Sequence, residues 1–246
     1  MTVESHPHRQ YPPPTRPWVG KMVWDDLLFE HWRVPFELLR PRVPAGLELE
    51  THDGSAWIGV VPFLMRGVRV RGTPPLPGIS QFPELNVRTY VSHRGRPGVW
   101  FFSLDAAQPL AVMAARAVFH LNYQNATMSC VRDGEAVVYT SRRDGAPPGE
   151  AEYRARYAPL PRRVDGPPGS LPYFLTARYC LYAADDEGRL YKGEIDHPPW
   201  PLQEATAEVE VDTMTRPLGF DLPKEAPLRW FSRHLEVHAW APERLG

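Results

Sequence analysis

The sequence predicts an α+β domain in which β-strands dominate. Roughly ten or more segments alternate between apolar and polar residues, as strands do, and short turns separate them. Only about three or four segments have helical spacing, and strands and helices do not alternate regularly as they do in a parallel sheet. The 29 prolines lie mostly between the strand-like segments, where they stiffen loops.

The composition is that of a globular protein. The chain has 246 residues, of which 43% are hydrophobic and 23% charged, enough for one large domain or two small ones. The net charge of -1 gives no attraction to nucleic acid or to an anionic membrane surface, so we expect neither as a partner. No apolar run reaches the roughly 18 residues that cross a bilayer. Cys130 and Cys180 lack CxxC spacing, and no secretory leader is evident, which favours free thiols and a cytoplasmic protein.

The amino-terminal segments predict an arm followed by a helix. Residues 1–17 are polar and rich in proline, which predicts a flexible or extended arm in front of a single domain, 18–246. The segment 18–32 is amphipathic and predicts a short helix, with Asp25 or Asp26 as its cap. Its apolar residues are Met22, Leu27, Leu28 and Phe29.

Proline and glycine mark the next elements. Pro35 suits the first turn of a second short helix, 35–39, which Pro41 ends. The pair Asp53-Gly54 is typical of a tight turn and predicts a hairpin between 47–51 and 55–61. The proline-rich segment that follows, 71–83, is too rigid for a plain flexible linker.

The middle of the chain predicts two strands and a helix. A strand over 82–91 is followed by a turn at 94–98 and a very apolar strand over 99–104. Asp105 suits a cap at the start of the next helix, 109–121. This helix has one apolar stripe, formed by Leu110, Met113, Ala114, Ala117, Val118 and Leu121.

The remaining segments predict more strands of the same sheet system. Asp133-Gly134 and Glu187-Gly188 each predict a hairpin turn. Residues 202–211 and 234–240 alternate again, as strands do. Proline-rich loops at 142–170 separate strand-like segments, which we expect to share one sheet rather than to form two domains.

A row of polar side chains is the most informative feature of the 82–91 strand. With a period of two residues, Leu85, Val87, Thr89 and Val91 point to one face. The other face carries a carboxylate, an amide, a guanidinium and a phenol, from Glu84, Asn86, Arg88 and Tyr90. If this polar row faces water, it is an ordinary solvated sheet face. If it lines a cavity, it is suited to a small polar ligand.

Three residues of the last predicted strand deserve comparison with a metal site. His234, Glu236 and His238 share one face, and two histidines with a carboxylate can bind a divalent metal. A strand places the two histidines about 13 Å apart, which is too far for one ion. A solvated outer face is therefore the better interpretation, and we predict no metal. His6 and His8 lie in the arm.

Other catalytic motifs are missing from the sequence. There is no G-x-S-x-G nucleophile elbow, and neither cysteine has a basic flank or helix start to lower its pKa. No phosphate-binding glycine motif occurs, so a nucleotide cofactor is not indicated. We predict no cofactor.

Two further clusters are candidates for a site. Arg116 and His120 are i,i+4 on the predicted helix, off its apolar stripe, with Tyr123 beyond; they face either solvent or the cavity under the polar row. His197 and Trp200 lie in the run HPPWPL, whose prolines present an imidazole and an indole from a stiff support. A packed loop is the structural alternative for this run.

Several of these motifs together resemble a known family. They are His31-Trp32, WIGVVPF (57–63), FPELNVRTYV (82–91), GVWFFSLDA (98–106), Ala115-Arg116 and HPPWPL (197–202). The sequence resembles the YqjF-like proteins, the family of domain of unknown function 2071, in the acetoacetate decarboxylase-like superfamily. The resemblance extends from about Trp18 to Trp240.

The resemblance implies a large twisted antiparallel sheet that is curled into a cone or barrel around a central pocket. In acetoacetate decarboxylase, a pocket lysine forms a Schiff base. The corresponding stretch would fall near 100–123, which contains no lysine; the chain has only Lys21, Lys192 and Lys224. Lys192 lies beside Glu194 and suits a strand ion pair. We therefore predict no Schiff-base decarboxylation.

Three functional hypotheses remain open. In the first, an enzyme acts on a small carbonyl or carboxylate compound: Arg88 holds an anion, Tyr90 donates a hydrogen bond, and Glu84 or His120 transfers protons. In the second, the same pocket binds a small molecule without catalysis. In the third, the protein is structural and the polar row faces solvent. For the pocket hypotheses, the ligand-binding candidates are Asn86, Arg88, Tyr90, Arg116, Tyr123, His197 and Trp200, and a homo-oligomer remains open.

Overall fold

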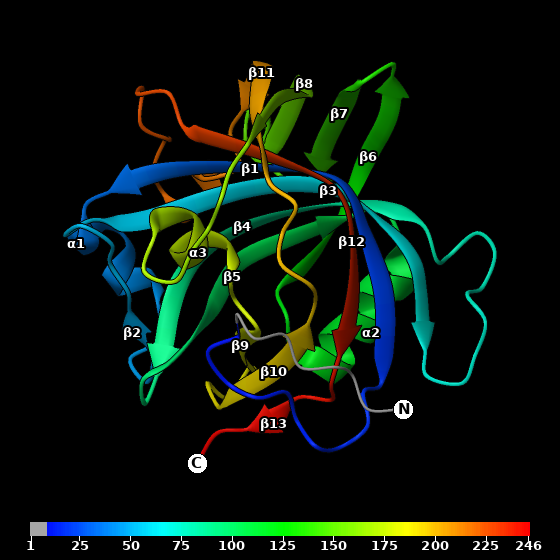
Figure 1. The fold of residues 1–246 in the computed structure, drawn as a ribbon, viewed down its shortest axis with the longest axis vertical. Helices are drawn as coiled ribbons and strands as arrows, with labels where there is room; N and C mark the ends of the chain where they lie inside the picture. Colours follow the sequence, from blue (N-terminus) through cyan, green and yellow to red (C-terminus); the bar gives the residue numbers. More distant parts are fainter. Residues whose placement is uncertain (1–8) are drawn as a thin grey trace.

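The computed structural model describes residues 9–246, which build one 13-stranded sheet (Figure 1). In chain order the elements are β1 (Gly20–Val34), α1 (Phe36–Leu39), η1 (Arg40–Arg42), β2 (Glu48–Leu49), β3 (Ala56–Val70), β4 (Phe82–His93), β5 (Arg96–Ala106), α2 (Pro109–Phe119), β6 (Tyr123–Asp133), β7 (Ala136–Arg143), β8 (Glu152–Arg163), α3 (Leu171–Thr176), β9 (Cys180–Ala184), β10 (Leu190–Asp196), β11 (Gln203–Asp212), η2 (Arg216–Leu218), β12 (Leu228–Ala239) and β13 (Glu243–Arg244). The predicted β-dominated α+β fold is confirmed.

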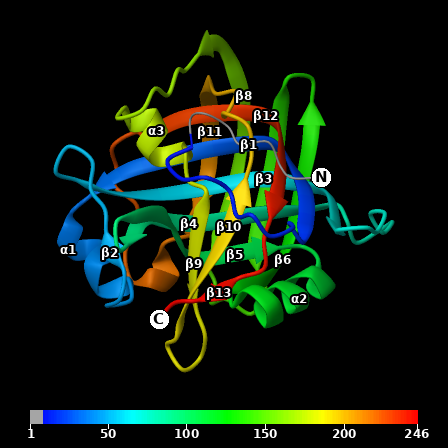
Figure 2. The ribbon, with the colours of Figure 1, turned by 60° about the horizontal axis from the view of Figure 1, so that its bottom comes forward.

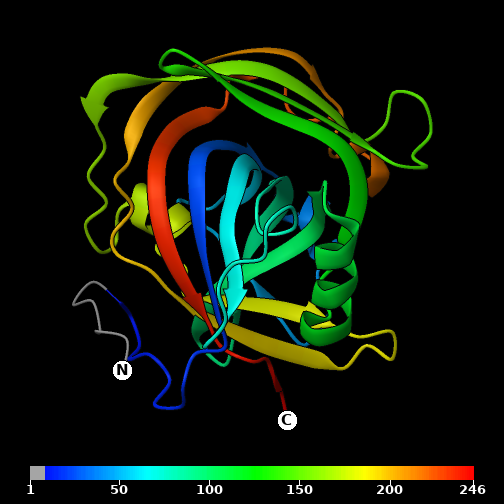
Figure 3. The same ribbon diagram turned by 90° about the vertical axis from the view of Figure 1, so that its right-hand side faces the viewer.

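The strand pairing closes into two rings that share a wall. The shared wall consists of β12, β1, β3, β4 and β5, paired antiparallel in that order. On one side, β6, β7, β8 and β11 connect β5 back to β12 and complete the large ring. On the other side, β9 and β10 make the same connection and complete the small ring. Figure 3 shows the first group arching over the top and β9 and β10 crossing below.

Because the wall lies between two rings, both of its faces are buried. On β3, Ile58 and Val60 belong to the core of the large ring, together with Tyr139, Tyr153 and Tyr157 of β7 and β8. The alternate residues Trp57 and Val61 belong to the core of the small ring, together with Leu175 of α3 and the loop residue Leu202. A strand of this wall therefore carries apolar residues on successive positions.

Strand β1 replaces the helix that the sequence predicts over 18–32. Its register against β3 shifts between Asp25 and Glu30, and Asp26 has a left-handed backbone with φ of 53°. This bulge changes which alternate residues face each ring: Met22 and Trp24 precede it on the small-ring side, whereas Leu27 and Phe29 follow it there. The resulting spacing of apolar residues imitates a helix.

Two smaller expectations need correction, and part of one helix is exposed. Asp53-Gly54 does form a turn, but β2 pairs with Val91 and Ser92 of β4 and not with β3. Asp105 does not cap α2; the Gln108 side chain accepts from the Leu110 amide, while Asp105 is buried at the end of β5 in an ion pair with Arg143. Three residues of the apolar stripe of α2 face outward, because Leu110, Met113 and Val118 are 55%, 63% and 52% exposed, whereas Leu121, just beyond the helix, is buried.

The predicted arm, 1–17, lies partly outside the described residues, which begin at Arg9. The part that the structure describes rests against the sheet, and Figure 2 shows it crossing β9 and β10. Arg9 donates to the Ile195 carbonyl at 2.9 Å and pairs with Asp196. Tyr11 donates to the Gly95 carbonyl at 2.6 Å. The flexibility of the arm and the domain boundary at residue 18 stay predictions.

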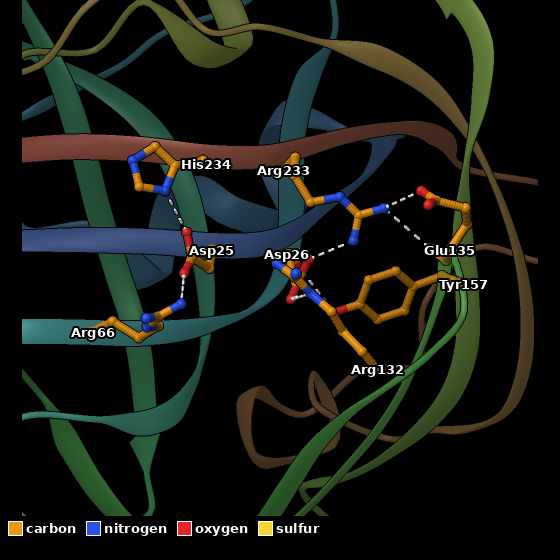
Figure 4. A network of polar contacts seen from close by, with 8 residues as sticks. All are labelled: Asp25, Asp26, Arg66, Arg132, Glu135, Tyr157, Arg233 and His234. Atoms are coloured by element: carbon orange, nitrogen blue, oxygen red, sulfur yellow. Dashed lines mark hydrogen bonds and ion pairs between the residues drawn. The ribbon is translucent and has the colours of Figure 1, made fainter.

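Two adjacent buried aspartates hold β1 at its bulge (Figure 4). Asp26 accepts from Arg132 of β6 at 2.6 Å and from Arg233 of β12 at 2.7 Å. Its carbonyl also accepts from the Tyr157 hydroxyl of β8 at 2.8 Å. Asp25 pairs on the other face with Arg66 of β3 and His234 of β12. The bulge is thereby tied to strands of the shared wall and to two strands of the large ring.

We predict that Asp26→Asn destabilises the fold. Asparagine tolerates the left-handed backbone, so the change removes charge without backbone strain. Losing the buried carboxylate leaves Arg132 without its partner and Arg233 with Glu135 alone. It costs about 3 kcal/mol, the low end for a broken buried pair, because Arg132 is half exposed and Arg233 keeps one ion pair. Chemical denaturation measures the loss. Glu210→Gln, which removes an exposed partner of Arg154, is the control and should cost less than about 1 kcal/mol. Equal effects of the two variants would contradict the prediction.

Candidate functional site

The polar row of β4 faces the interior of the small ring and not solvent. Glu84, Asn86 and Tyr90 are buried, and Arg88 is partly buried. Tyr90 belongs to the apolar core of the small ring, on the face opposite Leu85 and Val87. The row is therefore placed in a low-dielectric interior, where each polar group needs a partner or a ligand.

The centre of the row is a register of three residues on neighbouring strands. His31 of β1 lies opposite Gly59 of β3, and Gly59 lies opposite Arg88 of β4. Gly59 has no side chain, and a Cβ atom there would come within 3.0 Å of the His31 ring and 3.5 Å of Arg88. The histidine ring thus occupies the space over β3 that a side chain at position 59 would fill.

Arg88 is held by aromatic rings and a hydroxyl. Its guanidinium carbon lies 5.1 Å from the Phe29 ring centroid and 5.9 Å from that of Tyr90, and it hydrogen-bonds the Tyr90 hydroxyl. Among the described residues no carboxylate forms an ion pair with Arg88, and its Nε is buried without a partner. A second cation, Arg178, lies 5.2 Å from the Tyr90 ring but pairs with Glu50. Arg88 is therefore the cation of this cluster without a counterion.

His31 and Tyr90 form a buried hydrogen-bonded pair. The imidazole Nε2 lies 2.5 Å from the Tyr90 hydroxyl oxygen. Burial, reinforced by the charge of Arg88, lowers the pKa of His31 well below its ordinary value, so the ring is neutral. Burial raises the pKa of Tyr90, whose hydroxyl therefore keeps its proton.

Glu84 forms a second buried polar contact, at the other end of the row. Its carboxyl group accepts from the Tyr123 hydroxyl at 2.9 Å. Burial is the main reason that the pKa of Glu84 rises to about 8, with a smaller contribution from the charge of Asp105. At neutral pH this carboxyl is largely protonated and can act as a general acid. Arg88 lies four positions further along the strand, or about 13 Å away.

The loop with the HPPWPL run supplies part of the surrounding wall. Trp200 packs edge-on against Phe29 at 4.9 Å, stacks on Trp24 at 5.8 Å, and donates to the Thr176 carbonyl. His197 lies farther from the polar row, between Tyr179 and Trp200. Trp200 thus contacts Phe29, the ring that packs against Arg88, and His197 contacts Trp200.

Arg116 and His120 lie elsewhere, at a groove of about 1080 Å³ outside the small ring. Arg116 is exposed and donates to the Tyr123 carbonyl. His120 caps the carboxyl end of α2, and its ring is tilted by 31° against the Tyr191 ring at a centroid distance of 4.3 Å. The groove is also lined by Trp100 and by Asp185–Glu187. Of the predicted site residues, the structure brings together Glu84 with Tyr123, and Arg88 with Tyr90, near Asn86 and Trp200.

The sequence analysis did not select His31 or Arg178 for the site. His31 lies in the segment that the sequence analysis interpreted as a helix. Interpreted as a strand that continues after the bulge, this segment places His31 on the same face as Phe29. Arg178 comes from the loop before β9, and no local pattern links it to Tyr90. Both are joined to the row only by the tertiary fold.

The remaining charged candidates have partners outside this site. Lys192 pairs with Glu194 at 3.2 Å, as predicted, and Lys21 pairs with Glu236 at 2.8 Å. His234 binds Asp25 on the outer face of β12. Within residues 9–246, no three metal-binding side chains converge, and no helix is long and apolar enough to cross a membrane.

Comparison with known proteins matches nearly the whole chain. The family model DUF2071, described as an uncharacterized conserved protein, matches residues 21–236. The uncharacterized protein YqjF of Bacillus subtilis (strain 168) is 43% identical over 223 residues, which cover 91% of each chain.

Solved structures with the same fold include two kinds of enzyme. The enduracididine biosynthesis enzyme MppR, solved with pyruvate, superposes with a TM-score of 0.66 at 14% identity, covering 99% of both chains. Acetoacetate decarboxylase from Legionella pneumophila superposes with a TM-score of 0.65 at 11% identity, covering 100% of this chain and 98% of the other. At these identities the likeness shows the fold, which is that of acetoacetate decarboxylase.

We predict that Glu84 makes the stability depend on pH. The folded carboxyl has a pKa of about 8, whereas the unfolded one ionises near its ordinary value of 4.5. Its contribution is therefore complete below about pH 4.5 and is lost as the pH rises through about 8, with a slope of at most about 1.4 kcal/mol per pH unit.

Denaturation between pH 5 and 9 measures this contribution. Glu84→Gln should flatten the decline in the free energy of unfolding. Glu236→Gln, on the outer face beside Lys21, should leave it in place because that carboxyl has a lowered pKa. A decline as steep in Glu84→Gln as in the parent protein would refute the assignment.

Proposed function

Because the chain belongs to the DUF2071 family and has the fold of acetoacetate decarboxylase, we propose that it binds a small carboxylate or carbonyl compound inside the small ring. The observation that carries the proposal is Arg88, a cation inside the fold without a carboxylate partner among the described residues. An anionic ligand supplies the missing charge. The pyruvate bound to MppR is consistent with this ligand class.

The chemistry that we propose for the site is proton transfer. Glu84 keeps its proton near neutral pH and lies on the same face as Arg88, so it can donate to an oxygen of a bound compound. Tyr123 holds the carboxyl in place through its hydroxyl. His120, the other predicted proton donor, lies at the outer groove and has no place in this proposal.

A second candidate function is binding without catalysis. The separation of about 13 Å between Glu84 and Arg88 along the strand supports it, because a compound smaller than that span cannot reach both groups. Measured turnover separates the two: loss of turnover but not of binding in Glu84→Gln supports catalysis.

We further propose that the reaction does not use a Schiff base. The stretch 100–123 lacks lysine. Lys192 lies on β10 and forms ion pairs with Glu194 and Glu243, whereas the polar row lies on β4. A guanidinium such as that of Arg88 stays charged and does not form the imine that a lysine forms. For its location, the unpaired thiols Cys130 and Cys180 support a cytoplasmic protein.

Binding of small carboxylates tests the proposal. Titration with pyruvate and acetoacetate, with acetone as the uncharged control, should show binding of at least one acid and weaker binding of acetone, which lacks the charge that Arg88 would meet. Arg88→Met should weaken this binding about 10- to 100-fold, because a charge-assisted hydrogen bond contributes about 1.5–3 kcal/mol. Arg116→Met, at the outer groove, is the matched control and should bind normally. Equal binding by the two variants, or no binding of either acid to the parent protein, would overturn the proposal.

Borohydride trapping tests the absence of an imine. Treatment with sodium borohydride and acetoacetate should leave Lys21, Lys192 and Lys224 unmodified in the intact-protein mass. Denatured protein carries the same three lysines without their native environment and serves as the comparison. A mass increase that maps to Lys192 in the folded protein would show that the Schiff-base route is open.

A further inference from the structure

The His31–Tyr90–Arg88 cluster contains a fixed order of donors and acceptors. A guanidinium only donates hydrogen bonds, so the Tyr90 hydroxyl accepts from Arg88. That hydroxyl has one proton, and the His31 Nε2 at 2.5 Å is the neighbour placed to accept it. The direction of the chain therefore runs from Arg88 through Tyr90 to His31.

This direction assigns the histidine tautomer. The groups around the ring are the cation Arg88, the neutral Tyr90 and the rings of Phe29 and Trp230, so no carboxylate favours a charged imidazole. A neutral ring that accepts at Nε2 carries its proton on Nδ1. The His31 Nδ1 is buried without a hydrogen-bond partner among the described residues. No contact at Nδ1 therefore competes with the contact at Nε2 in deciding which nitrogen carries the proton.

We propose that His31 is a positioning residue that fixes Arg88 through Tyr90, and that it does so as the Nδ1-protonated tautomer. The inference rests on the proposed function for its consequence, but not for its geometry. With its proton committed to His31, the Tyr90 hydroxyl turns a lone pair toward Arg88 and holds the guanidinium. The other N–H groups of Arg88, including the unpartnered Nε, remain available to an anionic ligand.

Gly59 makes this arrangement possible. The three residues His31, Gly59 and Arg88 are in register, so a side chain at the middle position would stand between the other two. A Cβ atom at position 59 would lie 3.1 Å from the His31 Nε2, the atom that accepts from Tyr90. Gly59→Ala should therefore shift the imidazole and disturb the pair, although its φ is ordinary and the backbone itself tolerates alanine.

The tautomer can be measured without any ligand. In ¹⁵N-histidine-labelled protein, long-range ¹H–¹⁵N correlation spectra distinguish the two neutral tautomers and the charged ring. We expect the histidine signal that disappears in His31→Gln to belong to a ring that stays neutral from pH 5 to 8 with its proton on Nδ1; His197, whose Nδ1 faces the Pro198 carbonyl, keeps its signal in that variant. Tyr90→Phe should release the Nδ1 preference. A His31 that is charged at pH 6, or that carries its proton on Nε2, would overturn the inference.

A binding cycle tests the positioning role. The probe is pyruvate or acetoacetate, whichever the parent protein binds. His31→Leu and Tyr90→Phe should each weaken binding about tenfold, and the double variant should also lose about tenfold rather than a hundredfold, because both changes break one chain. His31→Gln, whose amide oxygen can accept from Tyr90, should restore most of the affinity. A hundredfold loss in the double variant would show that the two residues act independently.

The two proposals can fail separately. If the Nδ1 tautomer is found but Arg88→Met binds the probe normally, the proposed function fails and the hydrogen-bond chain stands. If Arg88→Met abolishes binding but His31→Leu does not affect it in a protein of unchanged melting temperature, the positioning role fails and the proposed function stands.

Discussion

The one-residue bulge in β1, held by Asp26, determines which side chains enter the small ring. A strand exposes alternate residues to opposite faces, so a single inserted residue exchanges the faces of everything that follows. After the bulge, Phe29 and His31 face Arg88, and Leu28 and Glu30 face the large ring. Without this shift, His31 would point away from Tyr90. The ion pairs of Asp26 thus stabilise the fold and, at a distance, set the composition of the candidate site.

Burial of the shared wall on both faces explains the electrostatics of the interior. In a sheet with one solvated face, water would accommodate Glu84 and Arg88 at little cost. Here the same alternation places them in a second core, and desolvation keeps the Glu84 carboxyl protonated and the His31 ring neutral. Arg88 cannot respond in this way because its guanidinium stays charged at any ordinary pH. Its charge must be met by rings, by hydroxyls or by a ligand.

Local sequence signals predicted those parts of the fold that depend on local chemistry. The turns Asp133-Gly134 and Glu187-Gly188, the helix after Pro35 and the polar row of β4 all follow from short-range rules. The bulge at Asp26 has no such signal, because aspartate in a left-handed conformation is uncommon and here depends on distant arginines. The orientation of α2 could not be predicted for another reason: an apolar stripe lies against the core only where a partner covers it, and Leu110, Met113 and Val118 are exposed. His31 and Arg178 join the site through tertiary contacts alone.

The fold and the chemistry of this protein are therefore separable. Enzymes with the same architecture are only 11–14% identical to this chain, so the likeness carries the fold and says nothing of the chemistry inside it. In this chain the row on β4 carries a guanidinium and a protonated carboxyl group, neither of which forms a covalent imine. Gly59 is a position where the shared wall has little room, because a methyl group there would lie 3.0 Å from the His31 ring. Specificity in such a site follows from strand register: three strands must stay aligned for His31, Gly59 and Arg88 to meet.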